Sequence, residues 1–146
     1  VCIQSHSREV VFSSSDPVKV IFDKSNVIRF GQDTEKINRL EQAKALQSQV
    51  MLYRVWVLKA LKRGHWLEAI SYYHECILEP FAKVLRLRYT PEKFEYGFKH
   101  FDQDLPDDVI TQLKTLTQID SGERLEFNLH KAVEWLNETV EELEKL

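Results

Sequence analysis

The sequence predicts an α+β chain that is mainly helical, in which a bundle of about four or five helices follows a short segment of two or three β-strands. Three observations indicate this fold class. Residues 1–31 are rich in β-branched and aromatic residues, whereas residues 34–143 repeat apolar residues at three- and four-residue steps. With 146 residues, 43% of them hydrophobic, the chain is long enough to bury one sizeable core. We therefore expect a β region over residues 1–31 and a helical region over residues 32–146.

In the β region, two runs carry the strand signal, residues 9–12 and 18–22, and loop residues separate them. We expect these runs to form a hairpin, with residues 27–30 as a third strand or an edge. So few strands do not form a stable sheet alone, so they must pack on the helices or belong to a larger sheet. Because the chain starts at Val1, without an initiator Met and already in strand-like sequence, we expect the natural protein to continue upstream.

The helical region opens with an amphipathic stretch over residues 34–49 that continues into the apolar residues 50–62. A helix that is apolar on nearly all sides must be covered by neighbours, so we expect this to be the central helix, ending at Gly64. A second helix over residues 66–89 should pack against it. Pro80 is expected to kink or split this second helix, because proline lacks an amide hydrogen and crowds the preceding turn.

Two more helices complete the predicted bundle. Pro106, followed by two aspartates, is typical of a helix start, because proline fits the first turn and acids favour the positive end of the helix dipole. The residues around Ser121 and Gly122 separate this helix from the last one, which carries a regular apolar stripe from Leu125 to Leu143. The loop between the second and third long helices is expected over residues 98–105.

Composition and charge exclude several classes of function. The formal net charge is -3 with 29% charged residues, which gives no general attraction for nucleic acid or for an anionic membrane. We find no apolar run of membrane-spanning length and no signal-peptide pattern. Cys2 and Cys76 lie far apart and match neither a disulfide framework nor a zinc site. We therefore expect a cytoplasmic protein with free thiols and no metal site of its own.

The usual catalytic motifs are missing: a Gly-rich phosphate loop, a serine nucleophile elbow, His-Glu-x-x-His and Cys-x-x-Cys. The polar face of the second helix is the best candidate for substrate binding. Its residues Tyr72, Glu75 and Glu79 would suit a cationic substrate if the disruption at Pro80 lined a cleft, while a solvated helix face explains them without a function. The aspartates from 102 to 108 are best explained as helix caps, Asp104 among them.

Two further patterns allow alternative interpretations. Basic residues alternate with aromatic ones over residues 83–100, which fits either phosphate and base contacts or a packed bundle end with cations reaching outward. Arg124 and His130 have the Arg-x5-His spacing of helical ribonucleases of the HEPN group, but six residues do not place a pair on one helical face. A solvent-facing histidine is the simpler account of His130.

The helical hairpin and its exit resemble the C-terminal helical domain of bacterial nucleotidyltransferases of the polymerase-beta superfamily, the group that contains aminoglycoside adenylyltransferases. The preceding strands resemble the last strands of that family's catalytic sheet. The resemblance covers most of the chain as an overall pattern. It is carried by Tyr53-Arg54-Val55-Trp56, residues 62–69, Leu78-Glu79-Pro80-Phe81, residues 85–89, Tyr96-Gly97-Phe98-Lys99-His100, Asp104-Leu105-Pro106 and residues 16–23.

The resemblance implies that residues 1–31 are the tail of a catalytic sheet and that residues 32–146 form a substrate-recognition bundle. In this family a Gly-Ser element and an Asp-x-Asp pair bind a nucleoside triphosphate and Mg²⁺. Neither of these two elements occurs here in strand context, so this chain should be inactive alone. We expect it to bind neither Mg²⁺ nor a nucleoside triphosphate by itself, and we expect a catalytic segment to precede it. Glu9 is the only candidate for the family's third carboxylate, and a solvent-facing strand residue is the alternative.

The function implied is the acceptor side of a transferase that moves a nucleoside monophosphate to the hydroxyl of a small-molecule acceptor. Two alternatives belong to other classes. One is a non-catalytic helical module for interaction or dimerisation, with a second copy of the chain as a possible partner. The other is a HEPN-like ribonuclease using Arg124 and His130.

Overall fold

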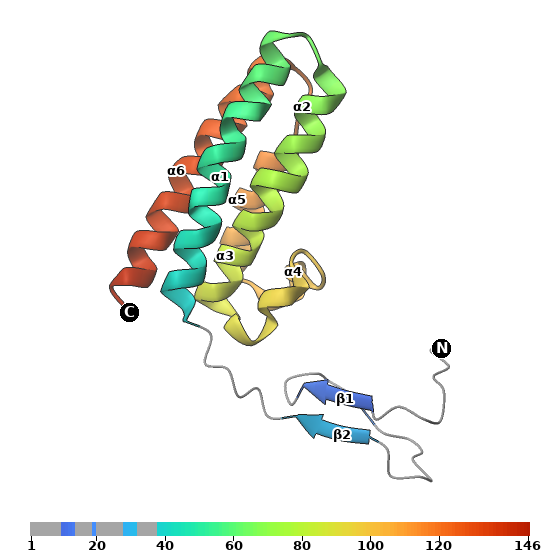
Figure 1. Ribbon diagram of the computed structural model, residues 1–146, viewed down its shortest axis with the longest axis vertical. Helices are drawn as coiled ribbons and strands as arrows, with labels where there is room; N and C mark the ends of the chain where they lie inside the picture. The colour runs from blue at the N-terminus through green and yellow to red at the C-terminus, as the bar shows by residue number, and fades with distance from the viewer. Residues whose placement is uncertain (1–9, 14–18, 20–27, 32–37) are drawn as a thin grey trace. The chain divides into compact units, whose positions relative to one another are not determined.

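The computed structural model describes residues 10–13, 19, 28–31 and 38–146. The chain divides into two compact units, Val1–Lys36 and Ile37–Leu146, and each is a body of its own. The expectation of a mainly helical chain is confirmed, because the second unit consists of helices joined by short connections (Figure 1). Its described residues include no helix that is both long and apolar enough to cross a membrane.

The first unit contains a pair of parallel strands, β1 (Val10–Ser13) and β2 (Ile28–Gly31), in which Val10 lies opposite Ile28. Parallel strands need a crossover connection instead of a tight turn. The hairpin expected between residues 9–12 and 18–22 falls mostly outside the described residues. Of that second run only Lys19 is described, and it belongs to no helix or strand.

The first long helix, α1 (Arg39–Lys62), begins with a side-chain cap. The Asn38 Oδ1 accepts a hydrogen bond from the Glu41 amide at 3.2 Å, and the Asn38 Nδ2 donates one to the Glu41 carboxylate at 3.1 Å. These bonds satisfy an amide that a helix start would otherwise leave unpaired. The helix ends where Gly64 adopts a φ of 74°, as its sequence position predicted. The start expected near residue 34 lies outside the described residues.

The second long helix is continuous but irregular. It comprises α2 (Trp66–Tyr73), a π-helical turn, η1 (His74–Leu78), and α3 (Glu79–Tyr89). The Glu79 amide donates to the carbonyl of His74, five residues earlier, and Pro80 follows in the first turn of α3. The disruption expected at Pro80 thus takes the form of a π turn. The turn accommodates one extra residue just before the proline, which has no amide hydrogen to donate to the helix.

The chain continues through a 3-10 helix, η2 (Pro91–Tyr96), and the one-turn helix α4 (Phe101–Asp104), which occupies part of the expected loop. The last two elements are α5 (Asp107–Thr117) and α6 (Gly122–Glu144). The Ser121 Oγ caps α6 by accepting from the Arg124 amide at 3.1 Å. Both helices lie where their apolar stripes predicted them.

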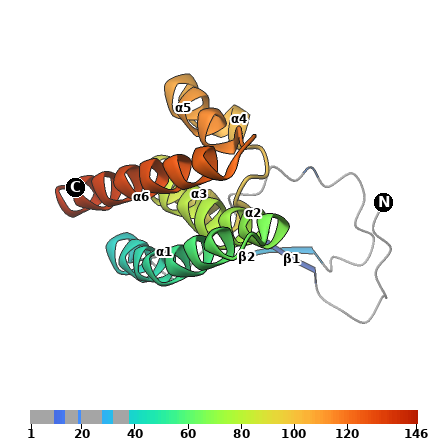
Figure 2. The same ribbon diagram turned by 90° about the horizontal axis from the view of Figure 1, so that it is seen from above.

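The bundle is built mainly from three long helices: α1, the continuous helix of α2, η1 and α3, and α6. The helix α1 packs against α2, α3 and α6, while α6 also packs against α3 and α5. In the view from above, α5 lies on the side of α6 and α3 that is remote from α1 (Figure 2). The helix α6 therefore contacts both α1 and α5.

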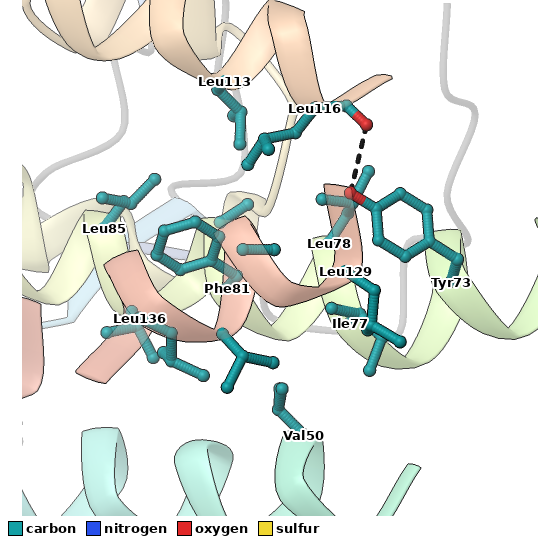
Figure 3. Packing of buried hydrophobic residues seen from close by; sticks show 14 of the residues in the cluster. Val50, Tyr73, Ile77, Leu78, Phe81, Leu85, Leu113, Leu116, Leu129 and Leu136 are labelled. Atoms are coloured by element: carbon teal, nitrogen blue, oxygen red, sulfur yellow. Dashed lines mark hydrogen bonds between the residues drawn. The ribbon is translucent and has the colours of Figure 1, made fainter. Parts of the chain in front are cut away.

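The core fills the space between these helices with aliphatic and aromatic side chains. Figure 3 shows Phe81 and Leu85 of α3 facing Leu129 and Leu136 of α6. The Phe81 ring meets Trp135 edge-on, with centroids 4.9 Å apart. The Tyr73 hydroxyl donates a hydrogen bond of 3.1 Å to the carbonyl of Leu116, near the end of α5. Figure 3 draws this bond as a dashed line. Burial raises the pKa of Tyr73, so this phenol keeps its proton and remains a donor.

One expectation about α1 is wrong: it is not covered on nearly all sides. Its fully buried positions are Ala43, Val50 and Val57, whereas Leu52 is 62% exposed and Trp56 is 48% exposed. The reason is geometric. The neighbours of α1 all contact its buried side, and no other helix of the Ile37–Leu146 unit packs on the opposite side. An apolar sequence alone does not show on how many sides a helix is covered.

Candidate functional site

An aromatic cluster joins α1 to α2 at the molecular surface. The rings of Tyr53 and Trp56 lie 5.9 Å apart and are tilted by 53°, and the rings of Trp56 and Tyr72 form a T-shaped pair with centroids 5.9 Å apart and an interplanar angle of 89°. Glu68 lies one turn before Tyr72 on α2 and accepts a hydrogen bond from its hydroxyl at 3.0 Å. We name Tyr53, Trp56, Glu68 and Tyr72 the aromatic-carboxylate patch.

The charge state of the patch follows from its hydrogen bonds. The His65 Nδ1 lies 2.9 Å from the Glu68 carboxylate, and this contact, followed by the bond from Tyr72, lowers the pKa of Glu68. The same carboxylate raises the pKa of Tyr72. Near neutral pH the patch therefore carries an ionised carboxylate beside a neutral phenol.

This arrangement suits an organic cation. The electron-rich faces of indole and phenol rings attract ammonium and guanidinium groups, and a carboxylate at the edge adds a charge-assisted hydrogen bond. The indole of Trp56 is 48% exposed, so a ligand can reach it without movement of the helices. The patch is a surface feature that offers contacts to one face of a ligand.

The three residues expected to bind substrate do not form one site. Tyr72 belongs to the patch, but Glu75 accepts from the Ser71 hydroxyl at 3.0 Å, and Glu79 lies against Gly97. A regular helix would have stacked all three. The π turn inserts one residue before Glu79, and each residue turns a helix by about 100°, so Glu79 leaves the face of Tyr72.

The catalytic candidate Glu9 lies outside the described residues, so its expected role stays a prediction. Among the residues that the structure describes, no group of three His, Cys, Asp or Glu side chains is arranged to hold a metal ion. Cys76 has a free thiol, and burial raises its pKa. A raised pKa keeps a thiol protonated and weakly nucleophilic.

Sequence reasoning missed the buried charge cluster around Arg86. This side chain is fully buried and donates from Nε to the Gly97 carbonyl at 2.7 Å and from Nη2 to the Lys99 carbonyl at 2.5 Å. Its Nη1 pairs with Asp104 at 3.1 Å, and Lys93 also binds that carboxylate. The cluster ties the segment after η2 to α3. No pattern in the sequence separates Arg86 from its neighbour Arg88.

Asp104 is therefore not the helix cap that the sequence suggested. The α5 N-cap position is Pro106, and no side chain caps that helix start. Burial alone would raise the pKa of Asp104, but the hydrogen bonds from Lys93 and Arg86 outweigh it and lower the pKa. Asp104 is thus the ionised partner in a buried network.

Several of the basic and aromatic residues over 83–100 contact one another at this end of the bundle. Lys83 lies over the Phe94 ring at 5.4 Å and pairs with Glu95 at 3.6 Å, and Lys99 lies over the ring of Tyr96 at 5.2 Å. Cations engaged with neighbouring rings and carboxylates are typical of a packed surface. The geometry favours the packed-end interpretation over contacts with nucleic acid.

A groove of about 380 Å³ runs between α5 and α6. The guanidinium of Arg124 lies in its wall, over the Phe127 ring at 5.5 Å. His130 does not line the groove, and its Nδ1 lies 2.8 Å from the Glu126 carbonyl. Six residues turn a helix by about 600°, which puts Arg124 and His130 about 120° apart on α6. The structure does not bring this pair together as a ribonuclease site.

Comparison with known proteins supplies no relative for this chain. No model of a protein family matches it, and neither the curated proteins nor the solved structures contain a similar one.

Proposed function

We propose that this chain is the acceptor-recognition part of a nucleotidyltransferase and that its acceptor is a small, positively charged molecule. The observation that carries the proposal is the aromatic-carboxylate patch, where Tyr72 packs against the exposed Trp56 and its hydroxyl donates to the ionised Glu68. The transferase class itself comes from the sequence resemblance. In that class the helical part would hold the acceptor while Mg²⁺ and a nucleoside triphosphate bind to a catalytic segment elsewhere in the full enzyme.

The patch explains how a cation would be selected over a neutral analogue. An ammonium group over the Trp56 face gains a cation-π contact, and its hydrogens reach a carboxylate that stays ionised near neutral pH. A neutral hydroxyl compound in the same position keeps the hydrogen bond but loses both electrostatic terms. Because the patch is open to water, each term contributes modestly.

Binding by the chain is tested with kanamycin, an aminoglycoside with several ammonium groups, and with maltotriose as a neutral sugar of similar size. Isothermal titration calorimetry should detect kanamycin only. The Glu68→Gln variant should bind about five- to tenfold more weakly, because it keeps the shape but removes the charge. A Glu134→Gln variant is the matched control, since Glu134 pairs with Lys131 on α6. Equal binding of both sugars, or equal loss in both variants, contradicts the proposal.

Transfer activity is tested with the full-length natural protein, a nucleoside triphosphate and Mg²⁺, with mass spectrometry to detect the modified acceptor. The Glu68→Gln variant should raise the KM for the acceptor and leave the kcat nearly unchanged, because Glu68 is placed to bind and not to react. A full-length protein that transfers nothing to any cationic acceptor, while the chain still binds kanamycin, would refute the transferase class and retain the site.

A second candidate function, the interaction module, is favoured by a different observation. The outer face of α1 carries Leu52, Val55 and Trp56 with exposed fractions of 62%, 47% and 48%. Apolar side chains grouped in this way and flanked by polar ones mark surfaces that other proteins cover. The measurement that tests this candidate is the mass of the chain in solution.

A further inference from the structure

We infer that two copies of this chain pair through antiparallel contact of their α1 helices, about a two-fold axis near Leu52. The inference rests on the interaction-module candidate and names its partner, a second copy of the chain. It shares Trp56 of α1 with the transferase proposal, whose other residues Glu68 and Tyr72 belong to α2, so a second copy and a cationic ligand would compete for this side chain.

The first observation is the position of the apolar stripe. Leu52, Val55 and Trp56 are spaced by three and four residues, so they share one face of α1. They lie at the middle of a helix of 24 residues, which is about 36 Å long. A helix of this length with an apolar centre and polar ends has the layout of an interface, in which a rim surrounds the core.

The second observation is the symmetry of the exposed positions about Leu52. In an antiparallel pair with the axis at residue 52, Glu41 lies across from Arg63 of the other copy and Ala45 lies across from Lys59. Ser48 then faces Trp56, so that a small side chain meets the large indole. All of these positions are exposed in the chain. A two-fold interface must be complementary to itself, and this face meets that requirement.

Charge selects the antiparallel arrangement over the parallel one. The exposed face begins with an acid, Glu41, and ends with two cations, Lys59 and Arg63. Parallel helices would place each charged residue beside the same residue of the other copy, and the two like charges would repel each other. Antiparallel helices place Glu41 near Arg63 at both ends of the contact, which favours association and fixes its direction. Lys44 lies on the same part of α1 and already pairs with Glu144 of its own chain.

The mass of the full chain is measured by sedimentation velocity over roughly 1 to 100 µM. We expect the mass to rise from 17.3 kDa toward twice that value. The Leu52→Glu variant should weaken dimerisation on the order of tenfold or more, because it places two carboxylates across the axis. Phe127→Glu is the control, since Phe127 is 53% exposed on α6, in the wall of the groove to α5. Circular dichroism verifies that each variant remains folded.

The charges provide the sharper test. Each of the single variants Glu41→Arg and Arg63→Glu should weaken the dimer several-fold, because like charges then face each other at both ends. The double variant should recover most of the original dissociation constant, because it restores two opposite-charge contacts with reversed sign. The weakening in the single variants should fade at high salt, which screens these exposed charges.

Each result has a definite meaning. A chain that stays at 17.3 kDa at all concentrations overturns the self-pairing and leaves the stripe to a different protein partner. A dimer that Leu52→Glu leaves unchanged also overturns it, because the contact then lies elsewhere. A dimer that Leu52→Glu disrupts, but that the double charge variant does not restore, overturns the antiparallel arrangement. Kanamycin binding is measured at low protein concentration, where the chain is a monomer and Trp56 is open to a ligand, so the transferase proposal is judged separately.

Discussion

Replacing Arg86 by methionine is expected to be among the most destabilising single changes in this bundle. The substitution keeps an apolar stem of similar length but removes four hydrogen bonds. These bonds reach the carbonyls of Gly97 at 2.7 Å and Lys99 at 2.5 Å, the Thr90 hydroxyl at 3.2 Å and the Asp104 carboxylate at 3.1 Å. The Asp104 side chain is only 8% exposed, so it would be left as a buried charge with Lys93 as its remaining partner.

The magnitude follows from this geometry. Removing one partner of a buried ion pair costs about 3–5 kcal/mol, because the other charge stays desolvated. Since Lys93 still binds Asp104, we expect the lower end, about 3 kcal/mol. With a urea m value of about 2 kcal/mol/M for a chain of this size, the unfolding midpoint should fall by about 1.5 M. Circular dichroism at 222 nm follows the transition.

The neighbouring arginine is the matched control. Arg88 pairs with Glu142 at the surface, where the two side chains are 27% and 50% exposed, so Arg88→Met should cost less than about 1 kcal/mol. A double-mutant cycle of Arg86→Met with Asp104→Leu should show strong coupling, because the second change removes the charge that the first leaves unpaired. If Arg86→Met costs no more than Arg88→Met, the buried network does not stabilise this end of the bundle.

Two other predictions concern single side chains. Gly97→Ala should destabilise the chain more than Gly64→Ala: both glycines have positive φ, but only at Gly97 would the added Cβ meet another side chain, that of Glu79. We expect about 1 kcal/mol at Gly64 and more at Gly97 in urea unfolding, and equal costs would refute the contact. Tyr72→Phe should raise the pKa of Glu68 toward the ordinary value of a glutamate in an NMR titration, because a hydrogen bond to the ionised form is lost. A lowered pKa favours folding only while the carboxylate is ionised, so the effect of Tyr72→Phe on stability should vanish as the pH falls below the pKa of Glu68. If Tyr72→Phe leaves the pKa of Glu68 unchanged, the hydrogen bond is refuted.

Much of the helical unit was predictable because its signals are local. The left-handed position at Gly64, the irregularity at Pro80 and the apolar stripe of α6 each depend on residues within a turn or two of one another. The register of α5 was likewise predictable from its acids and its apolar spacing. Local backbone chemistry and helical period are properties of the chain itself.

The candidate site was only partly predictable. The sequence singles out Tyr72 as a candidate binding residue, but nothing in it pairs Tyr72 with Trp56 on α1. Glu79 was grouped with Tyr72 on the assumption of a regular helix, and the π turn separates them. The position of a side chain after an inserted residue depends on how the backbone absorbs a missing hydrogen bond, which the spacing of residues does not reveal.

The sequence by itself determined that this chain is mainly helical, where its long helices end and which stripes they bury, because these follow from residue spacing and from the special conformations of glycine and proline. Only the tertiary structure decided that α1 leaves Leu52 and Trp56 exposed, and that Arg86 is buried with Asp104 while Arg88 is not. Those outcomes depend on contacts between residues far apart in the chain. Burial and charge pairing are set by which helices meet, and the same side chain is core, surface or ion-pair partner according to that packing.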